Sequence, residues 1–203
     1  MPLPGSDRAT GRNPEQLLHR PEQDGAGPGE VIPRARAALL AGAVAIALNM
    51  ATLAAAKLVS LDTGSGGLLK FLVILTGGVV RVPSSGAFQA AFHISIGLAM
   101  ALFYAFALEP LLPGPSWLRG LLYAVAVWLA NALIVLPAIG EGLAGSRRLT
   151  LAGMAWFAAA HTLFFVAQAI LYARLQQERR LAAGRSKNDG GLSGRIIRCN
   201  VAH

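Results

Sequence analysis

Four long stretches without a single charged residue dominate this chain. They cover residues 37–56, 82–108, 120–140 and 149–173. A helix needs about 20 apolar residues to cross the ~30 Å hydrocarbon core of a bilayer, and every stretch reaches that length. We therefore predict an all-α polytopic membrane protein, a four-transmembrane-helix bundle with disordered N- and C-terminal tails. The expected spans are about 37–58, 84–108, 117–137 and 150–173.

The composition agrees with this prediction. Apolar residues make up 54% of the chain and charged residues 14%, whereas about 25% of residues are charged in a typical soluble domain. The net charge of +8 comes from basic residues at the ends and in loops. That distribution is typical of topology signals and contacts with anionic lipid headgroups, and it argues against nucleic acid as a partner. The single cysteine, Cys199, excludes an intrachain disulfide.

Three segments lie outside the expected spans. The Pro/Gly-rich leader, 1–35, and the basic tail, 175–203, are too polar to bury a core, so we expect the leader to be disordered and the tail mostly so. The apolar segment 68–80 is too short to span. We expect it to lie at the membrane interface or to re-enter the membrane, and a fifth crossing is the third alternative. A cleaved first span is the rival to an uncleaved one, because Ala54-Ala55-Ala56 offers a cleavage site.

Positive charges near the span ends predict the orientation. With four spans, one side holds nine basic residues and the other five. Excess Lys and Arg mark the cytoplasmic side, so both termini are expected in the cytoplasm. The nine are Arg20, Arg34, Arg36, Arg119, Arg174, Arg179, Arg180, Arg185 and Lys187. The five are Lys57, Lys70, Arg81, Arg147 and Arg148.

Small residues spaced four apart predict the contact faces, because helices in lipid associate through close packing and interhelical hydrogen bonds. The expected rows are Ala43, Ala47, Ala51 and Ala55; His93, Gly97, Ala101 and Ala105; Ala126 and Ala130; and His161, Phe165, Ala169 and Ala173. Polar residues on or beside these rows are the candidate interior groups. They are His93, His161, Asn49, Asn131, Gln168, Tyr104 and Tyr172.

The second and fourth spans share a pattern. His93 and Tyr104 are eleven residues apart, and so are His161 and Tyr172. Eleven residues make about three helical turns, so each tyrosine lies on the histidine's side of its helix. Duplication of a two-helix hairpin would produce this pattern, and so would chance in alanine-rich helices.

His93 and His161 are the histidines of the expected membrane region, and an ionisable group there is a functional hypothesis by default. Three interpretations stay open. Each imidazole can hydrogen-bond across the bundle as a packing residue, the pair can serve a proton or small-solute path, or the two can ligate a b-type haem. We expect no cofactor, with haem b as the alternative, and no metal.

Sequence motifs of catalysis are absent. The chain has no HExxH, GxSxG or P-loop pattern and no pair of neighbouring carboxylates within the spans. We therefore expect no enzyme, but a structural, interaction or accessory membrane protein. The alternatives are a small-solute or proton transporter or channel-like protein using the two histidines, and a haem-binding electron carrier. Expected partners are the lipid bilayer, anionic headgroups through the basic tail, and a second copy or another membrane protein.

One set of residues carries a resemblance to a family. The set is His93, Gly97, Tyr104, Pro113, the run Trp117-Leu118-Arg119-Gly120, Tyr123, Trp128, Pro137, Gly140 and His161. In this pattern, over about 36–174, the chain resembles a group of small bacterial inner-membrane proteins with four helices and no assigned function. The resemblance implies a four-span bundle in a cell inner membrane and implies no activity.

Overall fold

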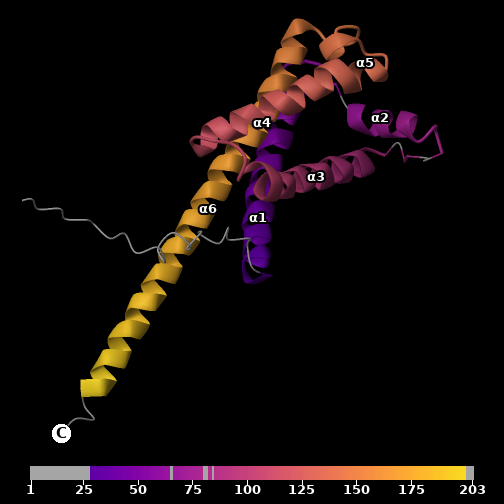
Figure 1. Ribbon diagram of the computed structural model, residues 1–203. Coiled ribbons are helices and arrows are strands. Elements are labelled where there is room, and N and C mark those ends of the chain that lie inside the picture. Colours follow the sequence, from indigo (N-terminus) through magenta and orange to yellow (C-terminus); the bar gives the residue numbers. More distant parts are fainter. Residues whose placement is uncertain (1–27, 65, 80–81, 84, 200–203) are drawn as a thin grey trace, which may run out of the picture.

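The computed structural model describes residues 28–199 except 65, 80, 81 and 84, with side chains described from Glu30 to Arg185 (Figure 1). Most of the expected leader, and the end of the tail, lie outside the described residues. The elements are α1 (Pro28–Leu58), α2 (Gly67–Leu75), α3 (Gly86–Phe103), η2 (Tyr104–Leu108), α4 (Ser116–Ala130), η3 (Asn131–Val135), α5 (Leu136–Ala138), η4 (Leu143–Gly145) and α6 (Leu151–Cys199).

The all-α, four-helix architecture is confirmed. Within the described residues, four helical segments are long and apolar enough to cross a membrane, namely Glu30–Leu58, Gly86–Leu108, Ser116–Ala138 and Leu151–Arg185. Consecutive spans alternate in direction. In Figure 1, α1 and α6 run side by side in opposite senses, and α3 and α4 lie obliquely across this pair.

The α1–α6 contact is made by small side chains of α1. Ala38, Ala41 and Ala45 are all buried. The row expected from the sequence was wrong, since Ala43 and Ala47 are exposed. An alanine-rich helix offers several rows of small residues, and the bulky ones decide between them. Leu40, Val44 and Leu48 occupy the neighbouring row and are exposed, so that side of α1 faces outward.

The row expected on the third span was also wrong. Ala126 and Ala130 are exposed, and α4 instead packs through Gly120, Tyr123 and Ala124. At Gly120 a Cβ atom would lie 2.7 Å from the carbonyl oxygen of Phe165, so only glycine allows this approach to α6. The close contact, rather than a stripe of alanines, therefore sets which face of α4 is buried.

The rows expected on the second and fourth spans agree better with the structure. In α3, Gly97 and Ala101 are buried, and in α6, Phe165 and Ala169 are buried, although Ala173 is exposed. The approach of α3 to α1 is also close. A Cβ atom on Gly42 would lie 2.6 Å from that of Ala101.

Two π-helical turns, η2 and η3, end two residues before Pro110 and two residues before Pro137. Proline has no N–H, and its ring clashes with the carbonyl four residues earlier, so an α-helix cannot run into it unchanged. The wider turn moves the hydrogen bonds back by one residue. The Glu109 amide, for example, donates to the Tyr104 carbonyl at 2.7 Å rather than to Ala105.

Helix ends differ from expectation in two places. The first helix begins at Pro28 rather than near 37, because proline suits a first helical turn and Glu30 lies there to complement the helix dipole. The last helix continues through the segment expected to be mostly disordered, as far as Cys199. Residues 174–183 are Leu, Gln, Glu, Arg and Ala, which are strong helix formers even without a core.

The doubtful segment 68–80 contains α2, a helix of nine residues. At 1.5 Å per residue it is ~14 Å long, less than half of the hydrocarbon thickness. In Figure 1 it lies between the beginning of α3 and α5. It therefore sits at the end of the bundle where α1 ends and α6 begins.

Candidate functional site: a cavity with two histidines

His93 and His161 face each other from α3 and α6. Their ring centroids are 6.3 Å apart and the ring planes are nearly perpendicular, at 84°. Both side chains are half-buried. The structure thus brings together the two groups that the sequence singled out, although α3 and α6 are not main packing partners.

Asn49 of α1 ties the two helices together. Its side chain is fully buried. Its Nδ2 donates to the Ala160 carbonyl of α6 at 2.9 Å, and its Oδ1 lies 2.9 Å from Nε2 of His93. One amide therefore links α1, α3 and α6 at a single depth.

His161 is oriented by its own helix. Its Nδ1 lies 2.8 Å from the Phe157 carbonyl one turn earlier. The Phe157 ring packs on the imidazole, with centroids 4.1 Å apart. The hydrogen bond at its edge and the phenyl ring on its face therefore fix the orientation of the imidazole.

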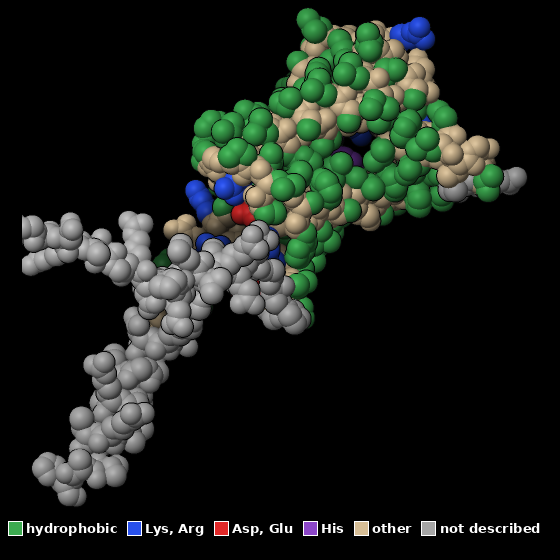
Figure 2. All heavy atoms as spheres, in the orientation of Figure 1, with side chains coloured by type: hydrophobic (Ala, Val, Ile, Leu, Met, Phe, Trp, Pro, Cys, Tyr) green, Lys and Arg blue, Asp and Glu red, His purple; other side chains and the backbone are tan. Residues whose placement is uncertain are grey.

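Both histidines line a cavity of about 430 Å³ between α1, α2, α3, α4 and α6. Most of its wall is aliphatic or aromatic. Its polar lining beside the histidines consists of Asn49, Asn131, Gln89, Lys57, Thr63 and Glu141. Figure 2 shows a hollow in the apolar surface with a histidine side chain visible inside. The space is therefore open to the surroundings and not sealed inside the bundle.

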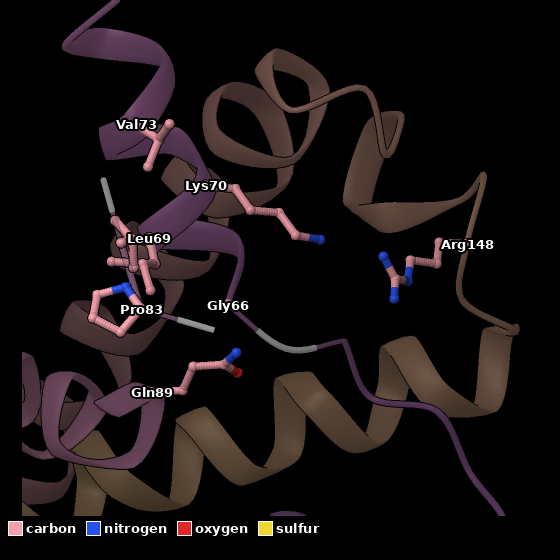
Figure 3. A pocket seen from close by; sticks show the side chains of 8 residues that line it. Gly66, Leu69, Lys70, Val73, Pro83, Gln89 and Arg148 are labelled. Atoms are coloured by element: carbon pink, nitrogen blue, oxygen red, sulfur yellow. The ribbon is translucent and has the colours of Figure 1, made fainter. Parts of the chain in front are cut away.

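At the α2 end, an ion-pair cluster borders the cavity. Glu141 Oε1 lies 3.0 Å from Lys70 Nζ of α2 and 3.4 Å from Arg148 Nη1 of the loop before α6. Figure 3 shows Lys70 and Arg148 reaching toward each other from opposite sides, above Gln89, around a smaller hollow of about 260 Å³. The ion pair with Lys70 thus holds α2 next to Glu141, which lines the larger cavity.

A cluster of aromatic rings packs behind Phe165, which lines the cavity. Tyr123 and Phe165 have centroids 4.4 Å apart, and Tyr104 packs on both Tyr123 and Tyr172 at 6.0 and 6.1 Å. Tyr104 and Tyr172 are buried. These four rings separate the histidines from the opposite end of the bundle.

A second ion-pair cluster lies beyond the rings. Glu109 is 3.6 Å from Arg34 Nη2 and 3.2 Å from Arg119 Nη1. Arg34 also donates to the Ala105 carbonyl at 2.9 Å and to the Tyr172 hydroxyl at 3.4 Å. The Ala105 carbonyl needs this partner, because the π turn diverts the Glu109 amide and Pro110 has none to offer.

The remaining interior candidates have different surroundings. Asn131 is half-buried on the cavity wall, and its Nδ2 donates to the Val127 carbonyl at 3.2 Å. Gln168 is 1% exposed on α6, and neither its amide oxygen nor its amide nitrogen has a partner among the described residues. Asn49, Asn131 and the two histidines therefore belong to the cavity, whereas Gln168 does not line it.

The sequence reasoning missed both ion-pair clusters and the cavity. It treated Arg34, Lys70 and Arg148 only as topology signals. A usable signal was present, because each span-end glutamate, Glu109 or Glu141, shares its side of the membrane with basic residues of other span ends. The indole N–H of Trp156 donates to the Thr52 carbonyl of α1 at 2.8 Å.

Metal-binding groups of three or more His, Cys, Asp or Glu side chains are absent from the described part of the chain.

Comparisons with known proteins add nothing to this geometry. No protein-family model, curated protein or solved structure matches the chain.

Proposed function

We propose that this membrane protein binds a small, mainly apolar solute in the histidine-lined cavity and serves its passage through the membrane. The observation that carries the proposal is the cavity itself, about 430 Å³ with both imidazoles in its wall. Ligand pockets are typically concave and mostly apolar, with a few convergent polar groups. The binding of a solute involves no chemical step, in line with the absence of catalytic motifs.

The asymmetry of the cavity supports passage rather than mere packing. One end is bordered by α2 and the Lys70–Glu141–Arg148 cluster. In the rest of the wall, the ring of Phe165 packs on Tyr123, which packs on Tyr104. A carrier that exposes its site to one side at a time has this arrangement in one of its states.

A purely structural role for the histidines is the weaker interpretation. Side chains that only join helices lie in tight contacts, because unfilled space beside apolar groups forfeits dispersion contacts. His93 and His161 instead border open space, although Asn49 shows that one of them also joins helices.

Binding of 1-naphthol to the protein in lipid nanodiscs tests the proposal. We expect saturable binding above that of empty nanodiscs. Replacing Ala90, which lines the cavity, by Trp should abolish this binding because the indole fills the space. The matched control is Ala91→Trp, at the next residue, which is exposed and does not line the cavity. Uptake that only follows the amount of lipid, or that is indifferent to Ala90→Trp, refutes the proposal.

Haem binding is the second candidate, and the geometry of the rings favours it. His93 and His161, on different helices with ring centroids 6.3 Å apart, are the residues that would hold such a group, which would supply electron transfer. His161 leaves Nε2 available for this, but Nε2 of His93 is engaged by Asn49. Addition of haem to the purified protein should then give a Soret band that His161→Ala removes, and an unchanged spectrum of free haem excludes this candidate.

The placement in a cell inner membrane, with both termini in the cytoplasm, also belongs to this proposal. It is supported by the bias of basic residues and by the extension of α6, where Arg174, Arg179 and Arg180 continue the helix beyond the last apolar turn. Such an extension can contact anionic headgroups. A C-terminal fusion to alkaline phosphatase should be inactive in cells, and a fusion to green fluorescent protein should fluoresce.

A further inference from the structure

We infer that the cavity selects solutes that donate a hydrogen bond, such as an apolar alcohol, phenol or amine, over ones that only accept. The inference deepens the proposed function and rests on it. Its basis is that hydrogen bonds to backbone and amide groups determine which nitrogen of each imidazole carries the proton.

Asn49 determines which ring nitrogen of His93 carries the hydrogen. A backbone carbonyl accepts hydrogen bonds and never donates, so the atom of Asn49 that meets the Ala160 carbonyl at 2.9 Å is the NH₂ group. The amide oxygen is then the atom 2.9 Å from His93. Because this oxygen also only accepts, Nε2 of His93 must carry the hydrogen.

The Phe157 carbonyl determines which ring nitrogen of His161 carries the hydrogen. Its Nδ1 lies 2.8 Å from the Phe157 carbonyl, which again only accepts, so Nδ1 carries the hydrogen. A neutral imidazole has one N–H and one bare nitrogen. The neutral forms of the two residues therefore leave bare Nδ1 on His93 and bare Nε2 on His161, and the described residues give neither atom a partner.

The surroundings of the two imidazoles favour their neutral forms. A charged imidazole beside the apolar wall would lose its hydration without a compensating partner. Asn131 also lines the cavity, and with one N–H bound to Val127 it keeps both an acceptor and a donor. Asn131 can thus adapt to either kind of solute, whereas the two imidazoles at the centre can only accept.

A solute that carries a hydroxyl or N–H group supplies the missing donor. One that carries a ketone or ether oxygen would place an acceptor against bare nitrogens and gain nothing there. A net hydrogen bond contributes ~1 kcal/mol, which is about a fivefold difference in Kd, and an unsatisfied buried polar group increases the difference. We therefore expect a donor to bind about five- to tenfold more tightly than a matched acceptor.

Two probes of equal apolar body test this inference, 1-naphthol and 1-methoxynaphthalene, which differ by replacement of the hydroxyl hydrogen with a methyl group. Both are titrated by equilibrium dialysis against the full chain in nanodiscs, with empty nanodiscs correcting for partition into lipid. We expect 1-naphthol to bind about five- to tenfold more tightly, and 1-naphthylamine to behave like 1-naphthol.

Variants assign the preference to the histidines. His161→Phe keeps an aromatic ring but has no bare nitrogen, so it should bring the Kd values of 1-naphthol and 1-methoxynaphthalene closer together. Ala90→Trp should abolish the binding of both probes. Equal binding of both probes that Ala90→Trp abolishes overturns the donor preference and leaves the proposed function standing. Tighter binding of 1-methoxynaphthalene also overturns it, and failure of both probes to bind overturns the inference together with the proposed function.

Discussion

Asn49 offers the sharpest test of how the site is held together. Replacement by Leu keeps the size of the side chain and removes two interhelical hydrogen bonds, to the Ala160 carbonyl and to His93, both 2.9 Å long. Such bonds between membrane helices contribute ~0.6 kcal/mol on average and ~1.7 at most. Asn49→Leu should therefore lower the free energy of unfolding by about 1–3 kcal/mol.

The measurement is reversible unfolding of the purified protein by sodium dodecyl sulfate in mixed micelles, followed by tryptophan fluorescence. Thr52→Val is the matched control on the same helix, because the Thr52 hydroxyl donates only within α1, to the Leu48 carbonyl at 2.9 Å. We expect that variant to stay within ~0.5 kcal/mol of the parent. In a double-mutant cycle, Asn49→Leu and His93→Phe should couple by at least ~0.5 kcal/mol. If Asn49→Leu is as stable as Thr52→Val, or the cycle shows no coupling, the amide does not join the helices as described.

Four further substitutions have outcomes that the packing and the ion pairs predict. Gly120→Ala should destabilise the protein by ~1–3 kcal/mol in the same unfolding assay, because its new methyl group meets the backbone of α6. Gly97→Ala should change the free energy of unfolding by less than ~1 kcal/mol, because its methyl group meets the flexible end of an isoleucine side chain and alanine has the higher helix propensity. Equal losses of stability in the two glycine variants would contradict the described packing. Glu141→Gln should speed hydrogen exchange of the α2 amides without changing that of α1, and unchanged exchange in α2 would show that the ion pairs do not hold it. Arg34→Met should lower the free energy of unfolding by ~1–3 kcal/mol, because it leaves the Ala105 carbonyl without its hydrogen-bond donor. An unchanged free energy of unfolding would mean that water replaces the guanidinium.

The positions and the number of the spans could be predicted because a helix that crosses the hydrocarbon core needs about 20 consecutive apolar residues. The loops of this chain contain no apolar stretch of that length. The inward position of His93 and His161 followed from the same physics, since an unpartnered polar group in lipid is costly. The proposed contact of Asn49 across helices is also present in the structure. These are properties of individual stretches of chain, and a single sequence contains them.

The contact faces of α1 and α4 were less predictable. Four-residue spacing in an alanine-rich helix is compatible with more than one face, and the choice depends on partners elsewhere in the chain. For α4 the choice depends on the approach of Gly120 to Phe165, which is a relation between two helices. The cavity is likewise formed jointly by α1, α2, α3, α4 and α6, so no local sequence pattern predicts it.

The two π turns have a consequence for how this chain can change over evolutionary time. A π turn contains one residue more than the α-helix it interrupts, so η2 and η3 each behave as a tolerated single-residue insertion. Deleting one residue from η2 would restore regular winding and leave the residues after it near their present orientation, because the wider turn already absorbs the extra residue. Glu109 would then stay beside Arg34 and Arg119, but an unbroken α-helix would run into Pro110. Deletions within these turns should therefore be confined to lineages in which the proline that follows has also been lost.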